Sequence, residues 1–289
     1  MSGCNLSMHL PENLVDEWIR EDIPFMDLTT SILGIANRPA KASIILRERA
    51  VMCGLQEASA IYRRLGAFVE NKIVEGTWGE PGQEPMVLQG TSGQLHAGWR
   101  VAQTLVSIGS GVATYTQLMV EKARKVNPKV IIVAARKAPP GLRHLYYHCV
   151  LCGGATPHRI GISDTVLIFP NHTRLLKGID GVIDRIKEAR SLIGERQVVV
   201  EVENLDEAIK AAKSGVIDEV QLDHVMPDKL YSFVTKIREV NDKVRIAVGG
   251  GINLDNIEKY ATTGVDVIVT SAPFWARPID LTTRIEELD

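Results

Sequence analysis

Residues 198–224, VVVEVENLDEAIKAAKSGVIDEVQLDH, contain one complete copy of a strand–helix–strand pattern. A short, mostly apolar and β-branched run (198–204) precedes a helical pattern that ends at Gly215, and a second apolar run (219–224) follows. Strands that are apolar on both faces are typical of parallel sheets, because helices cover both sides of such sheets. The stretch therefore predicts two parallel strands joined by a helical crossover.

The same unit recurs through the second half of the chain. Further apolar, strand-like runs lie at 130–137, 165–170, 244–251 and 265–272. Strands and helices alternate about every 20–25 residues, which indicates parallel strands with helical connections. At least six strands within about 150 residues favour a closed or nearly closed β/α barrel. An open, doubly wound sheet is the structural alternative.

The first part of the chain follows a different, α+β pattern. We expect a helix at 10–22, paired strands at 41–55, a helix at 57–69, a strand at 84–98 and a long helix at 97–122. Strands and helices are here not arranged as a regular repeat, which indicates a separate layer. The predicted domains are an N-terminal α+β domain over 1–115, packed with the C-terminal tail 276–289, and a β/α-barrel domain over 116–275.

The composition is that of an ordinary globular protein. The chain has 289 residues, of which 45% are hydrophobic, and a formal net charge of −2, so no overall charge favours nucleic acid or an anionic membrane surface. No apolar run reaches the ~18–20 residues that a membrane-spanning helix requires. Four cysteines without a secretion signal indicate reduced thiols and a cytoplasmic location.

Polar residues gather where the predicted barrel strands end, and β/α barrels carry their chemistry at those carboxyl ends. The ends supply cations, carboxylates and small residues, namely Arg136, Lys137, Glu201, Asp223, Gly249, Gly250, Gly251, Ser271 and Ala272. We expect Gly249–Gly251 to open a helix whose free N–H groups bind a phosphate, with Ser271 and Ala272 contributing from the next loop. Glycines that serve only a turn are the alternative for this motif.

The stretch ARKAPPGLRHL, residues 135–145, places Arg136 and Lys137 directly after an apolar strand. Two prolines then fix two φ angles of the turn that follows. Arginine binds a carboxylate or phosphate through paired hydrogen bonds, and lysine contributes a compact charge. The pattern predicts a site for a multiply charged anion. Arg143 belongs either to this site or only to the start of its helix.

Several motifs, in this order along the chain, resemble those of one enzyme family. They are SGVATYT, RKAPPGLR, GGATPHRIGISDTVLIFPNH, VEVEN, QLDH and GGGINLDNIEKYATTGVD, and EDIPFMDLTT resembles the family's N-terminal signature. The chain is thereby similar, over nearly its whole length, to quinolinate phosphoribosyltransferase, also called nicotinate-nucleotide pyrophosphorylase. HAGWRVAQ, IFPNH and TSAPFWARP resemble the pyrophosphorylase-like branch that is encoded with molybdenum transport genes.

The resemblance implies a fold, a reaction and an assembly. The implied fold is an incomplete β/α barrel with an N-terminal open-faced α+β sandwich. The implied enzyme is a pentosyltransferase that moves phosphoribosyl from phosphoribosyl pyrophosphate to a nitrogen heterocycle and releases pyrophosphate with the help of Mg²⁺. The implied assembly is a homodimer or higher homo-oligomer with a shared active site.

The resemblance also assigns residues. Catalytic positions are matched by Lys137, Glu201 and Asp223, and the last two also match the carboxylates that face Mg²⁺, directly or through water. Substrate-binding positions are matched by Arg136, His158, Arg159, Phe169 and Arg100, the last lent across the dimer. The 5′-phosphate loops are matched by Gly249, Gly250, Gly251, Ser271 and Ala272.

The chain departs from the quinolinate enzymes mainly on the acceptor side. Phe169 stands where they have a lysine, and Pro157 stands where they have an asparagine. These changes favour an acceptor other than quinolinate. Three alternatives stay open: a carboxylating nicotinate-nucleotide pyrophosphorylase of NAD biosynthesis, a non-catalytic ligand-binding protein linked to molybdenum metabolism, and an aldolase that forms a Schiff base on Lys137.

One predicted helix carries residues of the metal-ligand type. His144, His148 and Cys152 are spaced by four residues, and Cys149 lies beside them. A line of three such residues spans about 12 Å, which is too long for one ion. We therefore expect a partly buried helix face, with Cys149 and Cys152 as small core residues rather than a redox pair.

Overall fold

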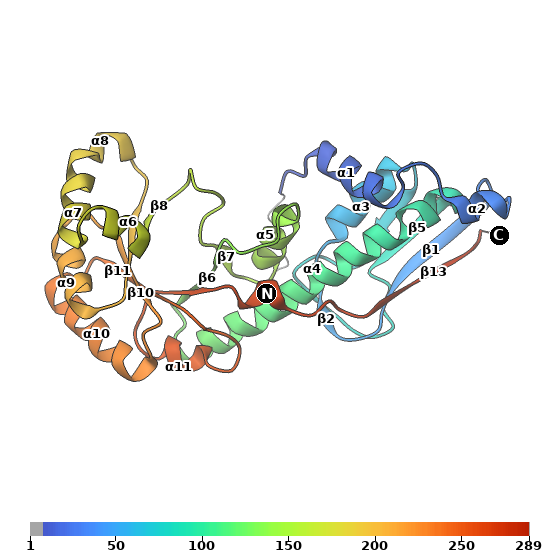
Figure 1. Cartoon of the computed structure of the whole chain (residues 1–289). Helices are drawn as coiled ribbons and strands as arrows, with labels where there is room; N and C mark the ends of the chain where they lie inside the picture. Colours follow the sequence, from blue (N-terminus) through green and yellow to red (C-terminus); the bar gives the residue numbers. More distant parts are fainter. Residues whose placement is uncertain (1–7, 289) are drawn as a thin grey trace. The chain divides into compact units, whose positions relative to one another are not determined.

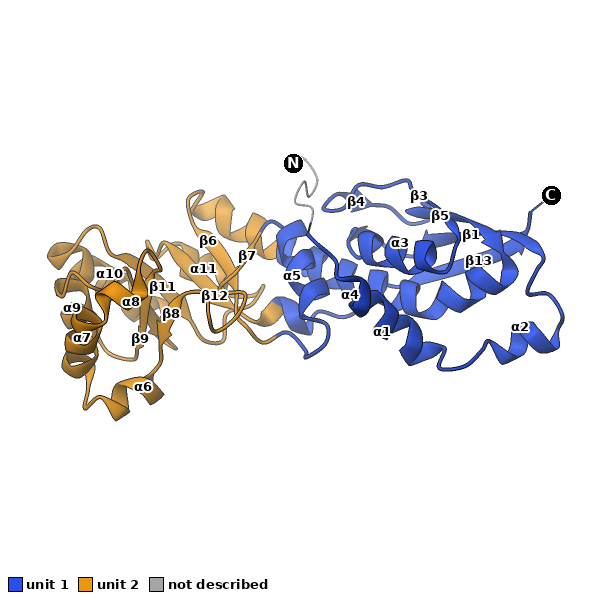
Figure 2. Ribbon diagram, turned by 90° about the horizontal axis from the view of Figure 1, so that it is seen from above, with its two compact units in different colours: residues 1–117, 138–154, 273–289 blue, residues 118–137, 155–272 orange. Residues whose placement is uncertain are grey.

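The computed structural model describes residues 8–288, and the chain divides into two compact units, coloured separately in Figure 2. Unit 1 contains residues 1–117, 138–154 and 273–289, and unit 2 contains residues 118–137 and 155–272. The boundary falls within the long helix α4 (Ser92–Val126). Each unit has its own main sheet (Figure 1).

Unit 1 is built on a four-stranded antiparallel sheet in the order β13-β1-β5-β3. The strands are β1 (Pro39–Leu46), β3 (Phe68–Asn71), β5 (Met86–Thr91) and β13 (Leu281–Glu287). Alternate residues of β1 are buried, as expected for a strand with one covered face. That face packs with α4 and α3 (Leu55–Arg64) around side chains such as Ile44, Tyr62 and Leu88.

The remaining elements of unit 1 are short. They are α1 (Glu12–Asp22), α2 (Leu28–Ile32), β2 (Ala50–Val51), β4 (Trp78–Gly79), α5 (Arg143–Cys152) and the 3₁₀ turn η1 (Ala272–Trp275), which starts at the unit boundary. Helix α1 is joined to α3 by an ion pair in which Arg64 Nε lies 2.7 Å from Asp16 Oδ1. The pairing of β13 with β1 places the C-terminal tail in unit 1.

Unit 2 is a curled, seven-stranded parallel sheet in the order β7-β6-β12-β11-β10-β9-β8. The strands are β6 (Ile131–Ala134), β7 (Thr156–Pro157), β8 (Val166–Ile168), β9 (Val198–Val202), β10 (Glu219–Asp223), β11 (Arg245–Gly249) and β12 (Val267–Thr270). The barrel is open between β7 and β8, which are the two sheet edges. The predicted incomplete barrel is therefore confirmed, and the doubly wound alternative is wrong.

Helices connect these strands as the alternation predicts. They are α6 (Pro170–Leu175), α7 (Ile179–Glu188), α8 (Arg190–Ile193), α9 (Leu205–Lys213), α10 (Pro227–Val240) and α11 (Ile257–Ala261). Helix α9 begins where the Asn204 side chain accepts a hydrogen bond from the Glu207 N–H, a standard N-cap. Within residues 8–288, no helix is long and apolar enough to cross a membrane.

Three details differ from the expectations. The strands in 41–55 do not pair with each other, because β1 pairs with β5 and β13 while β2 pairs with β4. The strand expected over 84–98 ends at Thr91, where α4 begins at once. Residues 138–154 lie in unit 1, although we expected them in the barrel domain. The last difference arises because α5 buries its apolar face, including Leu145 and Val150, within unit 1.

Candidate active site

The carboxyl ends of β9, β10 and β11 bring three of the predicted residues together in unit 2. Glu201 of β9 lies opposite Gln221 of β10, and Asp223 ends β10 opposite Gly249 of β11. These strands are hydrogen-bonded neighbours in one parallel sheet, so all of their carboxyl ends point to the same edge. The two carboxylates and the glycine loop therefore form one group, as the strand-end argument predicted.

The Glu201 carboxylate is partly buried and has other acids around it. Its Oε2 accepts a hydrogen bond from the Gln221 amide. Burial raises the pKa of Glu201, and the charges of Asp223 and Glu203 raise it further, to about 7, against the smaller lowering effects of His224 and Gln221. A cation placed among these carboxylates would favour the ionised form of Glu201.

The same group fits a hard divalent cation such as Mg²⁺, which prefers oxygen ligands. Asp223 Oδ2 lies 2.7 Å from His224 Nδ1, so His224 holds one oxygen of this carboxylate in place. The Gln221 Oε1 atom is buried and has no hydrogen-bond partner among residues 8–288. A buried acceptor without a donor is unusual in a folded protein, and a bound cation or ligand hydroxyl would satisfy it.

The glycine loop after β11 is fixed by its backbone. Gly250 has φ 95° and Gly251 has φ 68°, which are left-handed values that favour glycine. A Cβ atom at Gly250 would also lie 2.7 Å from the His224 ring. A Cβ at Gly249 would meet only ordinary contacts, the nearest being Gln221 at 3.5 Å. A small side chain at Gly249 would therefore fit against Gln221 and Asp223, while the next two glycines set the course of the loop.

The expected helix after this loop is not there. Helix α11 begins only at Ile257, and the N–H groups of Asn253 and Asp255 donate to side chains of the same turn. The prediction that Gly249–Gly251 opens a helix is therefore wrong, because local side-chain hydrogen bonds hold the turn instead. The N–H groups of Gly250 and Gly251 have no acceptor among the described residues.

The loop after β12 is tied to the glycine loop. Thr270 Oγ1 donates to the Ile252 carbonyl over 2.7 Å and accepts the Ala272 N–H over 3.0 Å. The two loops expected to bind phosphate are thus joined by one hydroxyl. Because this bond occupies the Ala272 N–H, Ser271 is the better placed of the two residues to meet an anion.

The cations predicted from the Arg-Lys stretch follow β6, which pairs with both β12 and β7. Arg136 and Lys137 are exposed. His158 follows β7, and its N–H donates to the Ala134 carbonyl over 2.9 Å. Its Nε2 is buried and has no partner among the described residues. Burial and the charges of neighbouring arginines lower the pKa of His158 to about 4, so the ring is neutral near pH 7.

Phe169 directly follows β8, at the position where the resemblance implies a lysine in the quinolinate enzymes. The Arg159 guanidinium lies 5.7 Å from the centre of the Phe169 ring, within the range of a cation–π contact. The other aromatic contact of Phe169 is with His172, whose ring is 6.0 Å away and stacked. An apolar ring therefore stands directly beside a predicted substrate-binding arginine.

One pocket in unit 2 includes cations that the sequence analysis did not select. It has a volume of about 360 Å³ and is lined by Glu201 and Glu203 and by Arg174 and Lys177 of the α6 region. Lys177 has φ 60°, a left-handed value that is uncommon for a residue other than glycine. The signal available in the sequence was the basic run RLLKG, which follows IFPNH after Thr173.

Two predicted arginines lie in unit 1, whereas the strand-end group lies in unit 2. Arg100 is exposed on α4, with its guanidinium 5.1 Å from the Trp99 ring centre. Arg143 begins α5, and its Nε is buried without a hydrogen-bond partner among the described residues.

Comparison with known proteins identifies the family. The model for "Quinolinate phosphoribosyl transferase, C-terminal domain" matches residues 112–284, and that for the N-terminal domain matches residues 27–110. The chain belongs to the quinolinate phosphoribosyltransferase family. Its membership confirms the enzyme class expected from the motifs, a pentosyltransferase of the phosphoribosyltransferase type.

Relatives of the chain within the quinolinate phosphoribosyltransferase family carry two kinds of name. A putative pyrophosphorylase ModD of Pasteurella multocida is 30% identical, over 97% of this chain and 99% of that protein. A probable carboxylating nicotinate-nucleotide pyrophosphorylase of Methanothermobacter thermautotrophicus is 32% identical, over 96% of this chain and 99% of that protein. The solved nicotinate-nucleotide pyrophosphorylase of Francisella tularensis has a TM-score of 0.87 and 28% identity, over 98% of this chain and 100% of that one.

Proposed function

We propose that this chain transfers the phosphoribosyl group of phosphoribosyl pyrophosphate to a nitrogen-heterocycle acceptor. The observation that carries the proposal is the grouping of Glu201 and Asp223 at neighbouring strand ends beside the glycine loop. In this reaction the bond between the anomeric carbon and pyrophosphate breaks, and pyrophosphate leaves with the electron pair. The acceptor nitrogen forms the new bond to the same carbon. Positive charge builds on the ribose, and two nearby carboxylates would stabilise it.

The remaining strand ends supply binding groups for the donor. The free N–H groups of Gly250 and Gly251, together with Ser271, would hold the 5′-phosphate. Arg136 and Lys137 are exposed cations that would meet the anionic substrates. Glu201 and Asp223 would hold Mg²⁺, directly or through water, and the ion would neutralise charge on the pyrophosphate.

The acceptor side favours a heterocycle with at most one acidic group. His158 is neutral near pH 7, and Phe169 supplies an apolar ring beside Arg159. Burying a second carboxylate against this ring is costly unless a cation pairs with it. The acceptor would therefore be a monoacid or a polar heterocycle rather than the diacid quinolinate.

The name of the Methanothermobacter relative favours a second candidate, a carboxylating nicotinate-nucleotide pyrophosphorylase. The two candidates share the donor and differ in the acceptor and in whether carbon dioxide is released. One assay distinguishes them: pyrophosphate release from phosphoribosyl pyrophosphate and Mg²⁺, measured against a panel of pyridine, pyrimidine and purine acceptors. Turnover with a monoacid or neutral heterocycle supports the first candidate, and efficient turnover of quinolinate with carbon dioxide release supports the second.

A binding measurement covers the case in which the right acceptor is not in the panel. Calorimetry should show that phosphoribosyl pyrophosphate binds in the presence of Mg²⁺, and that Asp223→Ala weakens the binding or abolishes turnover. If the donor does not bind the folded wild-type chain, the proposed function is wrong.

We also propose a homodimer or higher oligomer whose active sites are shared. The support is the exposed position of Arg100 on α4 and its match to the arginine lent across the family's dimer. A mixture of Arg100→Ala and Asp223→Ala chains tests the idea, because only the mixed dimer would contain one intact site. An equal mixture of two inactive variants should regain about a quarter of wild-type activity. No recovery after subunit exchange, or a fully active monomer, would exclude the shared site.

A further inference from the structure

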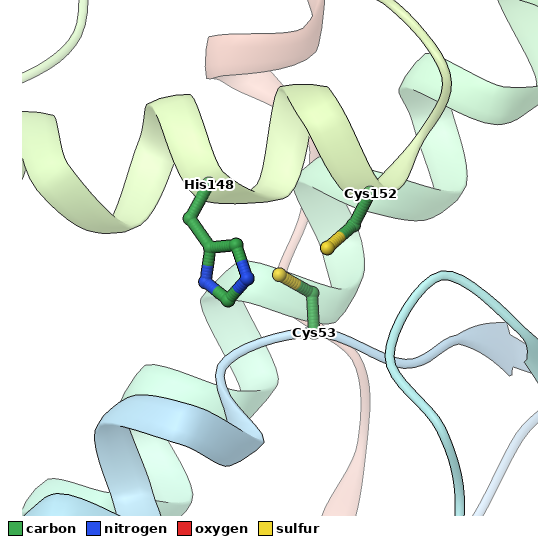
Figure 3. Close-up of side chains that lie close together, drawn as sticks. All are labelled: Cys53, His148 and Cys152. Carbon is green, nitrogen blue, oxygen red and sulfur yellow. The ribbon is translucent and has the colours of Figure 1, made fainter. Parts of the chain in front are cut away.

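Unit 1 contains a cluster of thiols and an imidazole that the proposed reaction does not use. Cys53 lies in the segment between β2 and α3, and His148 and Cys152 lie one turn apart on α5 (Figure 3). Their three ligand atoms all lie within 4.8 Å of one another. The exposed fractions are 0% for Cys53, 1% for His148 and 6% for Cys152, so the cluster is closed to solvent.

We propose that Cys53, His148 and Cys152 bind a structural zinc ion, with Glu75 as the fourth ligand. Zinc sites in proteins are tetrahedral, with bonds of about 2.3 Å to sulfur and about 2.0–2.1 Å to nitrogen or oxygen, so their ligand atoms are separated by about 3.3–3.8 Å. The separations between the three ligand atoms, all within 4.8 Å, need to shorten by about 1–1.5 Å at most to meet this geometry.

Glu75 lies beside the imidazole and would complete the site by moving towards the two sulfur atoms. Its Oε2 lies 3.3 Å from His148 Nε2, which is the separation expected of two ligands on one tetrahedral ion. Its other oxygen accepts the N–H groups of Leu55 and Gln56 over 2.7 and 3.3 Å, so the start of α3 holds the carboxylate in position. The carboxylate is thus anchored beside His148, and its Oε2 atom is the one that would turn towards the thiols when an ion binds.

The other side of the imidazole is arranged as in zinc sites. His148 Nδ1 lies 2.9 Å from Glu57 Oε1, and the Glu57 side chain is completely buried. Figure 3 shows the opposite ring nitrogen facing the sulfur atoms of Cys53 and Cys152. Histidines that bind a metal usually donate their second N–H to a carboxylate, which fixes the tautomer and the ring orientation.

The charges also favour a cation at this point. Two carboxylates, Glu57 and Glu75, face His148 in the interior of unit 1, and Glu57 also lies 3.5 Å from His144. Buried charges in proteins are paired or coordinate metals. Thiolate and imidazole ligands suit zinc, whereas Mg²⁺ and Ca²⁺ take oxygen ligands, so this site differs in kind from the carboxylate group of unit 2.

The ion would link two segments that are distant in the sequence. Helix α5 carries two of the ligands, and Cys53 and Glu75 lie on either side of α3. A line along α5 alone is too long for one ion, as the sequence indicated, and the structure avoids this by using Cys53 in place of His144. Because the two thiols and the imidazole are closed to solvent, the role is structural, and the ion would be bound as unit 1 folds.

The first test is the metal content of the untagged full chain, expressed in zinc-supplemented medium and measured by mass spectrometry. We expect roughly one zinc per chain in the wild type and at least a tenfold loss in Cys53→Ser, Cys152→Ser and His148→Gln. Cys149→Ser is the matched control, because Cys149 is equally buried but lies outside the three-ligand group. Zinc-free wild type, or equal zinc loss in the Cys149 variant, would overturn the assignment.

A spectroscopic test does not depend on native folding of the variants in the cell. The chain is unfolded with a chelator and refolded with Co²⁺, whose tetrahedral thiolate complexes absorb in the visible and near ultraviolet. Cys53→Ser should retain roughly half of the thiolate-to-cobalt absorption, because one of two thiolates remains. The absence of this absorption in the wild type would contradict the proposal.

A disulfide is the competing structure for this cluster. Cys53 Sγ lies 2.6 Å from Cys149 Sγ. Thiol counting on chain purified without oxygen decides between the two: a metal site leaves all described thiols reduced, and their reactivity appears only after the ion is removed. A Cys53–Cys149 disulfide in metal-free protein would refute the zinc site.

Discussion

Each unit of the chain gathers acids and a histidine, but the two groups are built in opposite ways. In unit 1, Glu57 and His148 are closed to solvent, and His148 also lies beside the thiols of Cys53 and Cys152. In unit 2, Glu201 and Asp223 stand at the carboxyl edge of a parallel sheet, and the loop after the neighbouring strand β11 has free backbone N–H groups. A closed group with soft ligands can stabilise a fold, whereas an open group with hard oxygen ligands can meet a substrate.

The contrast predicts that changes in unit 1 act on stability and changes in unit 2 act on turnover. A useful feature for measuring this is that all four tryptophans, Trp18, Trp78, Trp99 and Trp275, belong to unit 1. Tryptophan fluorescence therefore reports the unfolding of unit 1, while hydrogen exchange along β9 and β10 reports unit 2. Each variant is therefore tested for both stability and turnover, of which only one should change.

The largest effect is expected from Glu57→Gln, which removes a charge that faces His148 inside unit 1. Hydrogen bonds with His144 and His148 outweigh burial and lower the pKa of Glu57 to about 2, so the group is ionised in the folded chain. Breaking a buried charge pair costs about 3–5 kcal/mol. Denaturant unfolding followed by tryptophan fluorescence should show a loss of this size.

The control for Glu57 is Glu70→Gln in β3, because Glu70 pairs with Lys72 on the exposed surface of the same unit. An exposed pair contributes about 0–1 kcal/mol. Equal losses in both variants would remove the distinction between a closed charged group and a solvated one. The folded fraction of Glu57→Gln should keep the wild-type kcat.

Asp223→Asn should show the reverse behaviour. The change removes one of two carboxylates from the strand-end group but keeps the side-chain volume. Removing one group that stabilises charge in a transition state typically costs about 10²–10³-fold in kcat. We expect a loss of this size in pyrophosphate release, with unchanged tryptophan fluorescence unfolding.

Asp228→Asn is the matched control for Asp223, since Asp228 is an exposed aspartate at the start of α10. It should keep full activity. If Asp223→Asn also keeps full activity, the strand-end carboxylates of unit 2 do not carry the reaction. The expectation that changes in unit 2 act on turnover would then be wrong.

The open group was accessible to sequence reasoning because it follows from a periodic pattern. Once the parallel strands are placed, the polar residues at their ends must share one edge, and Glu201 and Asp223 needed no further information. The closed group was not accessible in this way. His148 and Cys152 are neighbours on one helix, but Cys53 lies on a distant segment, and only tertiary packing brings the three together.

The failures of prediction have a common physical cause, which is competition from local hydrogen bonds or from tertiary contacts. The helix expected after Gly251 starts late because Asn253 and Asn256 side chains bond to the turn. Residues 138–154 follow a barrel strand but bury their apolar face in unit 1. Neither effect appears in hydrophobic periodicity, which describes single elements and not their partners.

Phe169→Lys tests how the open group selects its acceptor. A lysine at this position would supply the charge that the resemblance implies for the quinolinate enzymes, and a hydrogen bond to a charged group contributes about 1.5–3 kcal/mol. The variant should therefore gain about 10–100-fold in kcat/KM for quinolinate. Phe169→Leu, which keeps an apolar side chain, should gain nothing.

Wild-type turnover of quinolinate at the rate of a dedicated biosynthetic enzyme, with no gain from Phe169→Lys, would contradict the acceptor assignment. It would mean that another cation, such as Arg174 or Lys177 of the neighbouring pocket, already pairs with the second carboxylate. Both outcomes concern only unit 2, so tryptophan fluorescence should be the same in all three proteins.

The smallest effect concerns pH and His158, whose ring is partly exposed. Its pKa in the folded chain is about 4, against 6.5 for an unperturbed histidine. Between these values the unfolded chain binds a proton at this position and the folded chain does not. Linkage therefore makes stability fall as the pH decreases from 6.5 towards 4, and above pH 6.5 this group contributes no slope.

The size of the His158 effect follows from the shift in its pKa. Each unit corresponds to about 1.4 kcal/mol, so the full shift would give about 3 kcal/mol, and solvent screening of a partly exposed ring reduces this to roughly 1–2 kcal/mol. His158→Gln should remove that part of the loss between pH 7.5 and 4.5, measured by hydrogen exchange in β9 and β10. His9→Gln, an exposed histidine of unit 1, should leave the slope unchanged. If His158→Gln leaves the slope of stability against pH unaltered, the His158 ring accepts a proton without penalty. The ring would then be more solvated than its buried Nε2 atom indicates.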